Sequence, residues 1–371
     1  MSSLRELETP ALLLDRRILD ANWRRMSEHV GRLGPALRLH VKTAKSVEVV
    51  RRLHDGRPGP ICVSTLKEAE IFGAHGYRDV LYTVALAPNK VTRAARLARA
   101  GVALKVVVDN VGLARAIARA PLEVLIEIDS DGHRAGLKPD DPQLVDVART
   151  LVDGGAVVSG VMTHAGASYG CRSPGEIRAM AKREADAVRQ AAARLRDAGF
   201  PAPVVSVGST PTATFAEDLG GITEVRAGVF VFQDLVMAGI GVCGTEDIAL
   251  SVLASVIGHQ RDRGWAIIDA GWMALSRDRG TARQHVDQGY GLVCDAGGRV
   301  LEGLIVVDAN QEHGIVAHRS GDPSRLPVLA VGTPLRILPN HACATAAQHA
   351  RYHVLGEGEE VESLWGRFGG W

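Results

Sequence analysis

Short hydrophobic runs alternate with longer amphipathic runs along the first two thirds of the chain. The short runs are rich in β-branched residues, and the longer runs are rich in Ala and Arg. This alternation predicts βαβ units built around a parallel sheet. The predicted strands cover residues 37–41, 61–65, 80–84, 104–109, 124–129, 157–164, 204–209 and 224–232. The predicted helices cover residues 20–33, 46–53, 66–74, 90–100, 142–152 and 173–198.

The predicted strands are apolar along their length, as expected of strands that are buried on both faces. Such strands fit either a (β/α)8 barrel or a doubly wound sheet. A count of about eight favours the (β/α)8 TIM-type barrel. In a barrel the polar residues at the carboxyl ends of the strands build the active site. The polar residues at these ends are His40, Lys42, Thr65, Asp129, His164 and Ser209.

The pattern changes near residue 245, where helical runs give way to short strands separated by Gly, Asp and Pro. Predicted strands here include residues 265–269, 291–294, 300–307, 314–318 and 334–338. This pattern of short strands and turn residues predicts an all-β second domain. We therefore expect a barrel over residues 16–244 and a β-strand domain formed by residues 1–15 with 245–371.

Composition and charge narrow the class of protein. The 371 residues are 46% hydrophobic and carry a formal net charge of +1, so no global field attracts nucleic acid or an acidic membrane. The five cysteines are scattered and form no CxxC pair, which fits a reducing compartment. No apolar run reaches the ~18 residues of a membrane span. We expect a cytoplasmic enzyme that acts on a small molecule, without nucleic-acid or membrane partners.

Three predicted strand ends carry residues suited to a carbonyl cofactor. Lys42 and Lys45 follow the first strand, where a lysine could form a Schiff base or could simply be solvated. Arg134 is a permanent cation that could hold an aromatic nitrogen or a carboxylate. His164 and Tyr169 could stack on a flat cofactor or move protons, or could form a satisfied polar cluster.

The segment VSVGSTPT, residues 205–212, ends a strand with Gly, Ser and Thr. Backbone N–H groups and hydroxyls in such a turn can converge on an anion, although an ordinary Gly/Pro turn has the same composition. Gly228 follows the next strand, and barrels commonly hold a phosphate in these last two loops. The sequence contains neither GxGxxG nor GxxxxGK[ST], which argues against a Rossmann or P-loop site.

A candidate metal pair lies near the carboxyl end of the chain. His341 and Cys343 would point to the same face of an extended segment, and an imidazole with a thiolate suits Zn²⁺. Two protein ligands would leave open positions for water or substrate. His349 and His353 follow, so a closed four-ligand site is an alternative, as is a buried cysteine beside a polar histidine.

Together these segments resemble the pyridoxal-phosphate (PLP) enzymes of the alanine-racemase-like fold. The resemblance is to the branch of D-threonine aldolases and eukaryotic-type D-serine dehydratases, and it extends from residue 8 to residue 345. The motifs that carry it are LHVKTAK, HRAG, THAGASYG, VGSTPT, DQGYG, NQEHG and PNHAC. Two positions depart from the family motif: the family has Pro where this chain has Leu39, and His where it has Ala44.

The resemblance implies a role for each matching residue. Lys42 would be the lysine that binds the cofactor, Arg134 would face the pyridine nitrogen, and His164 would lie against the ring with Tyr169 nearby. The phosphate would be held by Gly208, Ser209, Thr210 and Gly228. His341 and Cys343 would be the metal ligands. The family also implies a homodimer.

The metal pair bears on the reaction, because aldolases of this branch tend to have His-x-Asp and the dehydratases His-x-Cys. Cys343 therefore slightly favours a PLP- and metal-dependent lyase that removes water from D-3-hydroxy amino acids, such as D-serine or 3-hydroxy-D-aspartate. Its thiolate favours zinc over manganese or magnesium. The alternatives are retro-aldol cleavage, a racemase with Tyr290 as second base, and a non-catalytic PLP carrier.

Overall fold

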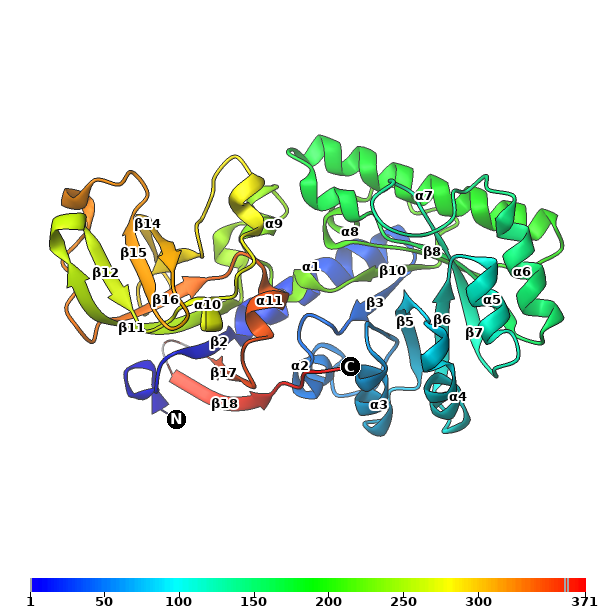
Figure 1. Cartoon of the computed structure of the whole chain (residues 1–371), viewed down its shortest axis with the longest axis horizontal. Coiled ribbons are helices and arrows are strands. Elements are labelled where there is room, and N and C mark those ends of the chain that lie inside the picture. The colour runs from blue at the N-terminus through cyan, green and yellow to red at the C-terminus, as the bar shows by residue number, and fades with distance from the viewer. Residues whose placement is uncertain (1, 357, 359) are drawn as a thin grey trace. The chain divides into compact units, whose positions relative to one another are not determined.

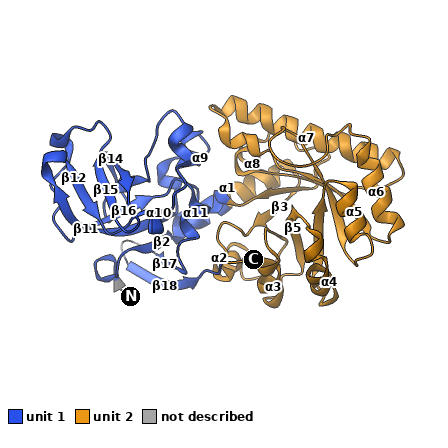
Figure 2. Ribbon diagram, in the orientation of Figure 1, with its two compact units in different colours: residues 1–23, 229–369 blue, residues 24–228, 370–371 orange. Residues whose placement is uncertain are grey.

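The computed structural model describes residues 2–356, 358 and 360–371, and the chain divides into two compact units (Figure 2). The barrel unit comprises residues 24–228 with 370–371, and the β unit comprises residues 1–23 with 229–369. The divisions lie within α1 (Arg16–Leu33), after Gly228, which follows the last barrel strand, and before Gly370. Residues 16–23 and 229–244, which we expected in the barrel domain, belong to the β unit. In the second of these segments, Asp234 bonds to the backbone of Ala342.

Eight parallel strands close the barrel in the order β10-β3-β4-β5-β6-β7-β8-β9 (Figure 1), which confirms the predicted (β/α)8 architecture. Each lies where the hydrophobic runs predicted it, although the last ends after four residues and continues as a 3-10 turn. The strands are β3 (Ala36–His40), β4 (Ile61–Val63), β5 (Asp79–Ala85), β6 (Ala103–Val108), β7 (Glu123–Ile128), β8 (Val157–Thr163), β9 (Val204–Val207) and β10 (Glu224–Ala227).

The six predicted helices of this unit all form, and two others form as well. Most begin at a side-chain cap: Ser46, Thr65 and Ser173 each accept a backbone N–H from the first turn of their helix. The two helices that were not predicted are α5 (Val111–Ile117) and α8 (Thr210–Phe215), of seven and six residues. The predicted ones, besides α1, are α2 (Val47–Leu53), α3 (Leu66–Ala74), α4 (Val91–Arg99), α6 (Gln143–Asp153) and α7 (Pro174–Asp197).

The barrel interior is apolar between two polar layers. Toward the amino ends of the strands, Arg38 pairs with Glu224 at 2.8 Å and with Asp79 at 3.0 Å. The carboxyl ends carry the polar groups of the candidate site. The apolar layer between them contains Cys62, Leu81, Val107, Leu125 and Met162.

Ten strands form the sheet of the β unit, in the order β1-β18-β17-β2-β11-β12-β15-β14-β13-β16. β11 pairs with β2, β12 and β16, so the amino-terminal segment belongs to this sheet. Five strands are additional to the predicted ones: β1, β2, β11, β17 and β18. The bounds are β1 (Ser2–Ser3), β2 (Ala11–Asp15), β11 (Leu250–Gln260), β12 (Trp265–Ile268), β13 (Leu292–Cys294), β14 (Val300–Ala309), β15 (Gly314–His318), β16 (Pro334–Leu338), β17 (Arg351–Leu355) and β18 (Glu360–Gly366).

Both units also contain short helical segments. The β unit carries α9 (Leu235–Gly239), α10 (Trp272–Leu275) and α11 (Ala342–Ala346). Single 3-10 turns are η1 (Leu4–Glu6), η2 (Pro88–Lys90), η3 (Gly166–Gly170), η4 (Val229–Val231), η5 (Thr245–Asp247), η6 (Arg261–Arg263), η7 (Gly280–Arg283) and η8 (Pro323–Arg325).

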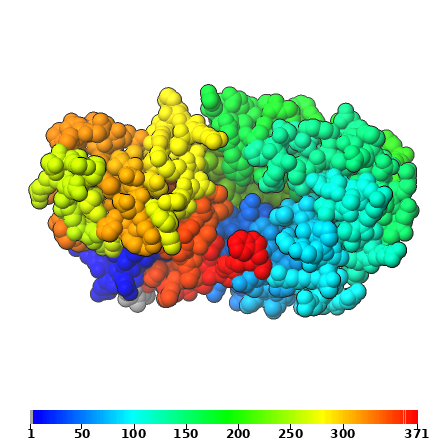
Figure 3. Space-filling view, in the orientation of Figure 1, coloured from blue at the N-terminus to red at the C-terminus, as the bar shows by residue number. Residues whose placement is uncertain are grey.

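The last two residues of the chain belong to the barrel unit, where Gly370 approaches Lys67 of α3. Figure 3 shows these carboxyl-terminal residues, in red, on the surface over the blue residues of that unit. In the described part of the chain, no helix combines the length and hydropathy needed to span a bilayer.

Candidate functional site

Lys42 and Lys45 lie in and just after the turn that follows β3, and the structure gives them different surroundings. Lys45 Nζ is 3.2 Å from Glu68 Oε1, and the Glu68 side chain is fully buried. The Lys42 side chain is exposed, and no hydrogen bond to its Nζ is found among the described residues. Lys45 is therefore held in a structural ion pair, whereas the amine of Lys42 is available for chemistry.

His40 holds the backbone of Lys42 in place. His40 Nδ1 accepts the N–H of Lys42 at 3.4 Å, and its Nε2 lies 3.0 Å from the hydroxyl of Thr83. The Thr83 hydroxyl donates to the carbonyl of Val63, so it accepts from His40 Nε2–H. Burial lowers the pKa of His40 well below its ordinary value, and the nearby positive charge of Lys42 lowers it further. The His40 imidazole is therefore neutral, with Nδ1 as a hydrogen-bond acceptor and Nε2 as a donor.

His164 and Tyr169 come together with the Gly-rich turn, as the sequence analysis expected. His164 Nδ1 lies 2.8 Å from the carbonyl oxygen of Gly208, which can only accept, so Nδ1 carries the hydrogen. The ring centroids of His164 and Tyr169 are 6.2 Å apart. Burial lowers the pKa of His164 to about 3, although the bond to Gly208 opposes this shift. Nε2 is therefore left as an unprotonated acceptor.

The depressed pKa of His164 predicts a pH dependence of stability. An unfolded histidine titrates near 6.5 and folded His164 near 3, so the unfolded chain takes up this proton first as the pH falls. The stability linked to this group is therefore complete above pH 6.5 and is lost as the pH falls toward 3. We expect His164→Gln to show a shallower fall in the free energy of unfolding over this window, measured by urea denaturation. His75→Gln, at an exposed position, should keep the native slope, and equal slopes for both variants would contradict the prediction.

The turn after β9 is shaped by two glycines that allow close backbone approach. Gly208 has φ +146°, and a Cβ there would lie 1.8 Å from the carbonyl oxygen of Arg226. A Cβ on Gly228 would lie 2.8 Å from the carbonyl oxygen of His40. Ser209 then caps α8, so the predicted strand over 204–209 ends at residue 207. The N–H of Gly208 donates to Glu184, so it is not available to bind an anion. Gly208 therefore contributes only to the shape of the turn.

Arg134 lies in the loop after β7, beside a buried acid that the sequence analysis did not identify. Its Nη2 is 3.9 Å from Glu127 Oε1, and its side chain is 60% exposed. Burial raises the pKa of Glu127, and the charge of Arg134 opposes that shift. Glu127 lies two positions after Leu125 of the interior layer, so strand alternation could have placed it inside the barrel. Arg226 is a second unidentified charge, buried where it donates to Ser206 Oγ and to the carbonyl of Thr163.

In the β unit, His341 and Cys343 lie at the start of a helix, so the predicted extended segment is wrong. His341 is the N-cap residue of α11, and Cys343 is in its first turn. The chain turns here because the N–H of Ala342 donates to Asp234 at 2.9 Å and the N–H of Thr345 to the carbonyl of His341. The side chains of His341 and Cys343 are nevertheless within hydrogen-bond reach of each other.

Three groups from distant segments hold this part of the chain in place: one bonds to His341, and two bond to the preceding residue, Asn340. His341 Nδ1 lies 2.6 Å from Asp278 Oδ2. Asn340 donates to the carbonyl of Gly289 and accepts from the hydroxyl of Thr281. Burial would lower the pKa of His341, but the acids and the thiol around it raise it to about 11. Asp278 could not be identified from the sequence pattern around His341, because it lies 63 positions earlier in the chain.

The alternative of a closed four-ligand site is not formed. His349 Nε2 bonds to the carbonyl of Ala274 at 3.0 Å, and His353 lies in β17. Among the described residues, no three His, Cys, Asp or Glu side chains come together in a way that could hold a metal ion. Tyr290, the alternative second base, lies under Arg279, whose guanidinium carbon is 5.3 Å from its ring.

Comparison with protein families accounts for both units. The alanine racemase N-terminal domain matches residues 14–235, and the serine dehydratase domain matches residues 249–355. The chain therefore belongs to the family defined by the alanine racemase N-terminal domain. D-threo-3-hydroxyaspartate dehydratase from Delftia sp. is 53% identical to it over 100% of the chain and 99% of the relative. D-serine dehydratase of Dictyostelium discoideum is 29% identical over 96% of each chain.

Solved structures agree with this assignment. That of the Delftia dehydratase covers all of both chains with a TM-score of 0.96 at 52% identity. Alanine racemases, at 21% identity or less, share the fold alone. D-threonine aldolase of Arthrobacter is 29% identical, so the comparisons favour the dehydratase over the aldolase prediction. These relatives confirm the predicted family of PLP-dependent lyases that act on small amino acids.

Proposed function

We propose that this protein is a PLP- and divalent-metal-dependent dehydratase of D-3-hydroxy amino acids, with 3-hydroxy-D-aspartate as the substrate class. The observation that carries the proposal is the His341 and Cys343 pair with Asp278 behind it, in a chain whose relative with that activity matches over its full length. Cys343 separates this site from the His-x-Asp pair typical of the aldolases.

The barrel residues fit PLP. Gly208 and Gly228 allow the close backbone approach that shapes the turn, and the amine of Lys42, in the turn after β3, has no hydrogen-bond partner among the described residues. We assign the phosphate to the turn of Ser209 and Thr210, with Gly208 and Gly228 shaping it. When bound, PLP would supply an electron sink for negative charge at the substrate α-carbon.

The other barrel residues hold or move protons around that cofactor. Lys42 would hold the cofactor through its amine, and the same amine would act as the base that takes up the substrate α-proton. His164, kept neutral by burial and bonded through Nδ1 to the carbonyl of Gly208, would lie against the ring with Tyr169. Arg134 would face the pyridine nitrogen, and its permanent positive charge would keep that nitrogen unprotonated.

The β-unit pair fits a soft divalent cation. Imidazole and thiolate favour zinc, with manganese and magnesium as the alternatives. His341 Nδ1 is engaged by Asp278, which leaves Nε2 for the metal. A bound metal would act as a Lewis acid on the substrate hydroxyl.

The reaction balances as a β-elimination. The α-proton goes to Lys42, hydroxide leaves the β-carbon, and water then releases ammonia and a 2-oxo acid. In the alternative retro-aldol reaction, the hydroxyl proton is removed and the Cα–Cβ bond breaks to give glycine and an aldehyde.

Product analysis tests the proposal. The reconstituted protein is incubated with D-threo-3-hydroxyaspartate and with D-threonine, with and without zinc, and the products are identified by mass. We expect oxaloacetate and 2-oxobutyrate with one ammonia each, and loss of both with a chelator. Glycine with glyoxylate or acetaldehyde would instead identify an aldolase, and interconverted D- and L-isomers a racemase.

Asp278 should act on the metal through His341. A carboxylate that binds the outer nitrogen of a metal-ligating histidine fixes its tautomer and orientation, and its loss typically costs about 10- to 100-fold in metal affinity. We expect Asp278→Asn to weaken zinc binding by this factor, measured by competition with a chromogenic chelator. Asp295→Asn is the control, since Asp295 pairs with Arg299 in an exposed turn. Unchanged zinc affinity in Asp278→Asn would assign Asp278 to folding alone.

We also propose that the protein is a cytoplasmic homodimer, as its family resemblance implies. Light scattering coupled to size-exclusion chromatography tests the dimer, and a mass of one chain (39.4 kDa) would contradict it.

A further inference from the structure

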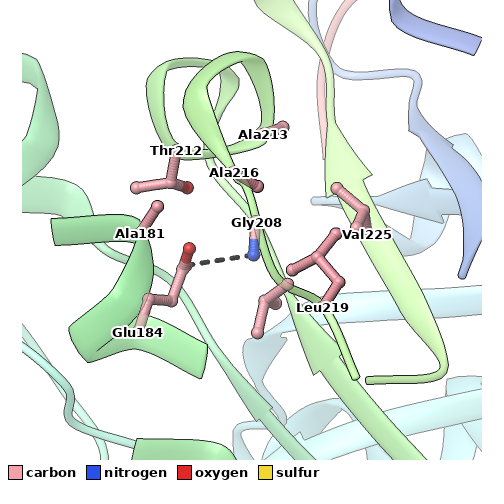
Figure 4. A pocket seen from close by; sticks show the side chains of 9 residues that line it. Ala181, Glu184, Gly208, Thr212, Ala213, Ala216, Leu219 and Val225 are labelled. Carbon is pink, nitrogen blue, oxygen red and sulfur yellow. Dashed lines mark hydrogen bonds between the residues drawn. The ribbon is translucent and has the colours of Figure 1, made fainter. Parts of the chain in front are cut away.

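A buried acid that takes no part in the proposed chemistry lies directly beneath the Gly-rich turn. Glu184 is on α7, and its side chain points toward the backbone of Gly208 (Figure 4). It is 2% exposed. Glu184 Oε1 accepts the N–H of Gly208 and the N–H of Ala165, each at 3.0 Å. A single carboxylate oxygen therefore bridges two segments that are far apart in the sequence.

The two N–H groups lie just beyond the paired part of the β8 and β9 ladder. Register pairs run from Gly160 with Val204 to Met162 with Ser206. Beyond that point, Glu184 and the bond from His164 Nδ1 to the carbonyl of Gly208 connect the two strand ends. Glu184 thus sets the spacing between the imidazole and the turn.

Glu184 also ends a chain of hydroxyl groups under the turn. It forms a side-chain hydrogen bond with Thr212, whose hydroxyl is 2.9 Å from that of Ser209. The Ser209 hydroxyl is 2.8 Å from that of Ser168, the residue before Tyr169. The small cavity in Figure 4 is lined by Glu184, Gly208 and Thr212 and otherwise by apolar side chains, such as Ala181 and Leu219. These buried side chains form hydrogen bonds with one another.

We propose that Glu184 is the positioning residue of the phosphate turn, which it holds at a fixed distance from His164 by accepting the N–H groups of Ala165 and Gly208. The proposal rests on the assignment of PLP to the barrel. It predicts that Glu184 acts on the phosphate part of the cofactor and not on the aldehyde that Lys42 binds.

The test compares the affinity of the apoprotein for PLP with its affinity for pyridoxal, which lacks the phosphate. Removal of the acceptor leaves two buried N–H groups unsatisfied, and the turn relaxes to satisfy them. We expect Glu184→Leu to weaken PLP binding about 10- to 100-fold, as the loss of such bonds predicts, while pyridoxal binding stays within about twofold. Glu184→Gln should keep most of the native PLP affinity, because its amide oxygen can accept both N–H groups.

Glu224→Gln is the matched control. Glu224 is also a buried carboxyl of the barrel, but it pairs with Arg38 at the amino ends of the strands. We expect it to lower the melting temperature without changing the ratio of PLP to pyridoxal affinity. Circular dichroism establishes that each variant is folded.

If Glu184→Leu does not fold, Glu184→Asp decides the question. Its side chain is one methylene shorter and cannot reach both N–H groups, so the affinity ratio should fall in this variant too. A native ratio in either folded variant, or a parallel loss of PLP and pyridoxal binding, would overturn the role of Glu184. A wild-type protein that shows no preference for PLP over pyridoxal would instead overturn the cofactor assignment.

Discussion

Lys42→Ala is expected to abolish covalent attachment of PLP and to lower kcat by at least about 10²–10⁴-fold, the usual contribution of a positioned proton-transfer group. Lys42 is the one of the two neighbouring lysines whose amine has no partner among the described residues. The measurement is the absorbance of the cofactor imine in the reconstituted protein, together with the rate of 2-oxo acid formation. Exchange of the substrate α-proton with solvent deuterium should stop as well, because the same amine removes that proton.

Lys45→Ala provides the control. Lys45 is three residues away and carries the same charge, but its amine is 3.2 Å from the buried Glu68. Its removal leaves a buried carboxylate without its cation, so the free energy of unfolding should fall while the imine absorbance persists. Imine absorbance that survives in Lys42→Ala and disappears in Lys45→Ala would reverse the assignment.

His341→Ala and Cys343→Ala are expected to separate dehydration from cofactor binding. A Lewis acid is worth several kcal/mol at a departing oxygen, so kcat for 2-oxo acid formation should fall by roughly a thousandfold in either variant. Bound zinc, measured by elemental analysis, should fall well below one ion per chain. The imine absorbance and the exchange of the α-proton should remain, because both depend on Lys42 in the barrel unit.

Cys343→Asp tests the same site by exchange of its ligand. A carboxylate is harder than a thiolate, so metal preference should shift from zinc toward manganese or magnesium. The readout is the metal that restores activity to the chelated protein, with the wild type treated in the same way. A variant that still prefers zinc, or an alanine variant that retains both zinc and dehydration, would exclude the pair as the metal site.

The barrel was predictable because its signal is local. Each strand is a short apolar run, each helix has its own amphipathic period, and caps such as Ser46 and Ser173 lie beside the helices they begin. Lys42, His164 and Gly208 were identified for a related reason, since in a parallel barrel the strand ends converge on one face. The family motifs then gave each of these residues an expected role.

The residues that hold the site together carry no such local signal. Glu184 bonds to segments 19 and 24 positions away, and Asp278 bonds to His341 across 63 positions. Each looks like an ordinary charged residue in its own segment. Likewise, Cys343 is in a helix and not in an extended strand because Asp234, more than a hundred positions earlier, accepts the N–H of Ala342. Short-range periodicity encodes which segments are strands and helices, whereas the partners of a buried carboxylate depend on which segments packing brings together.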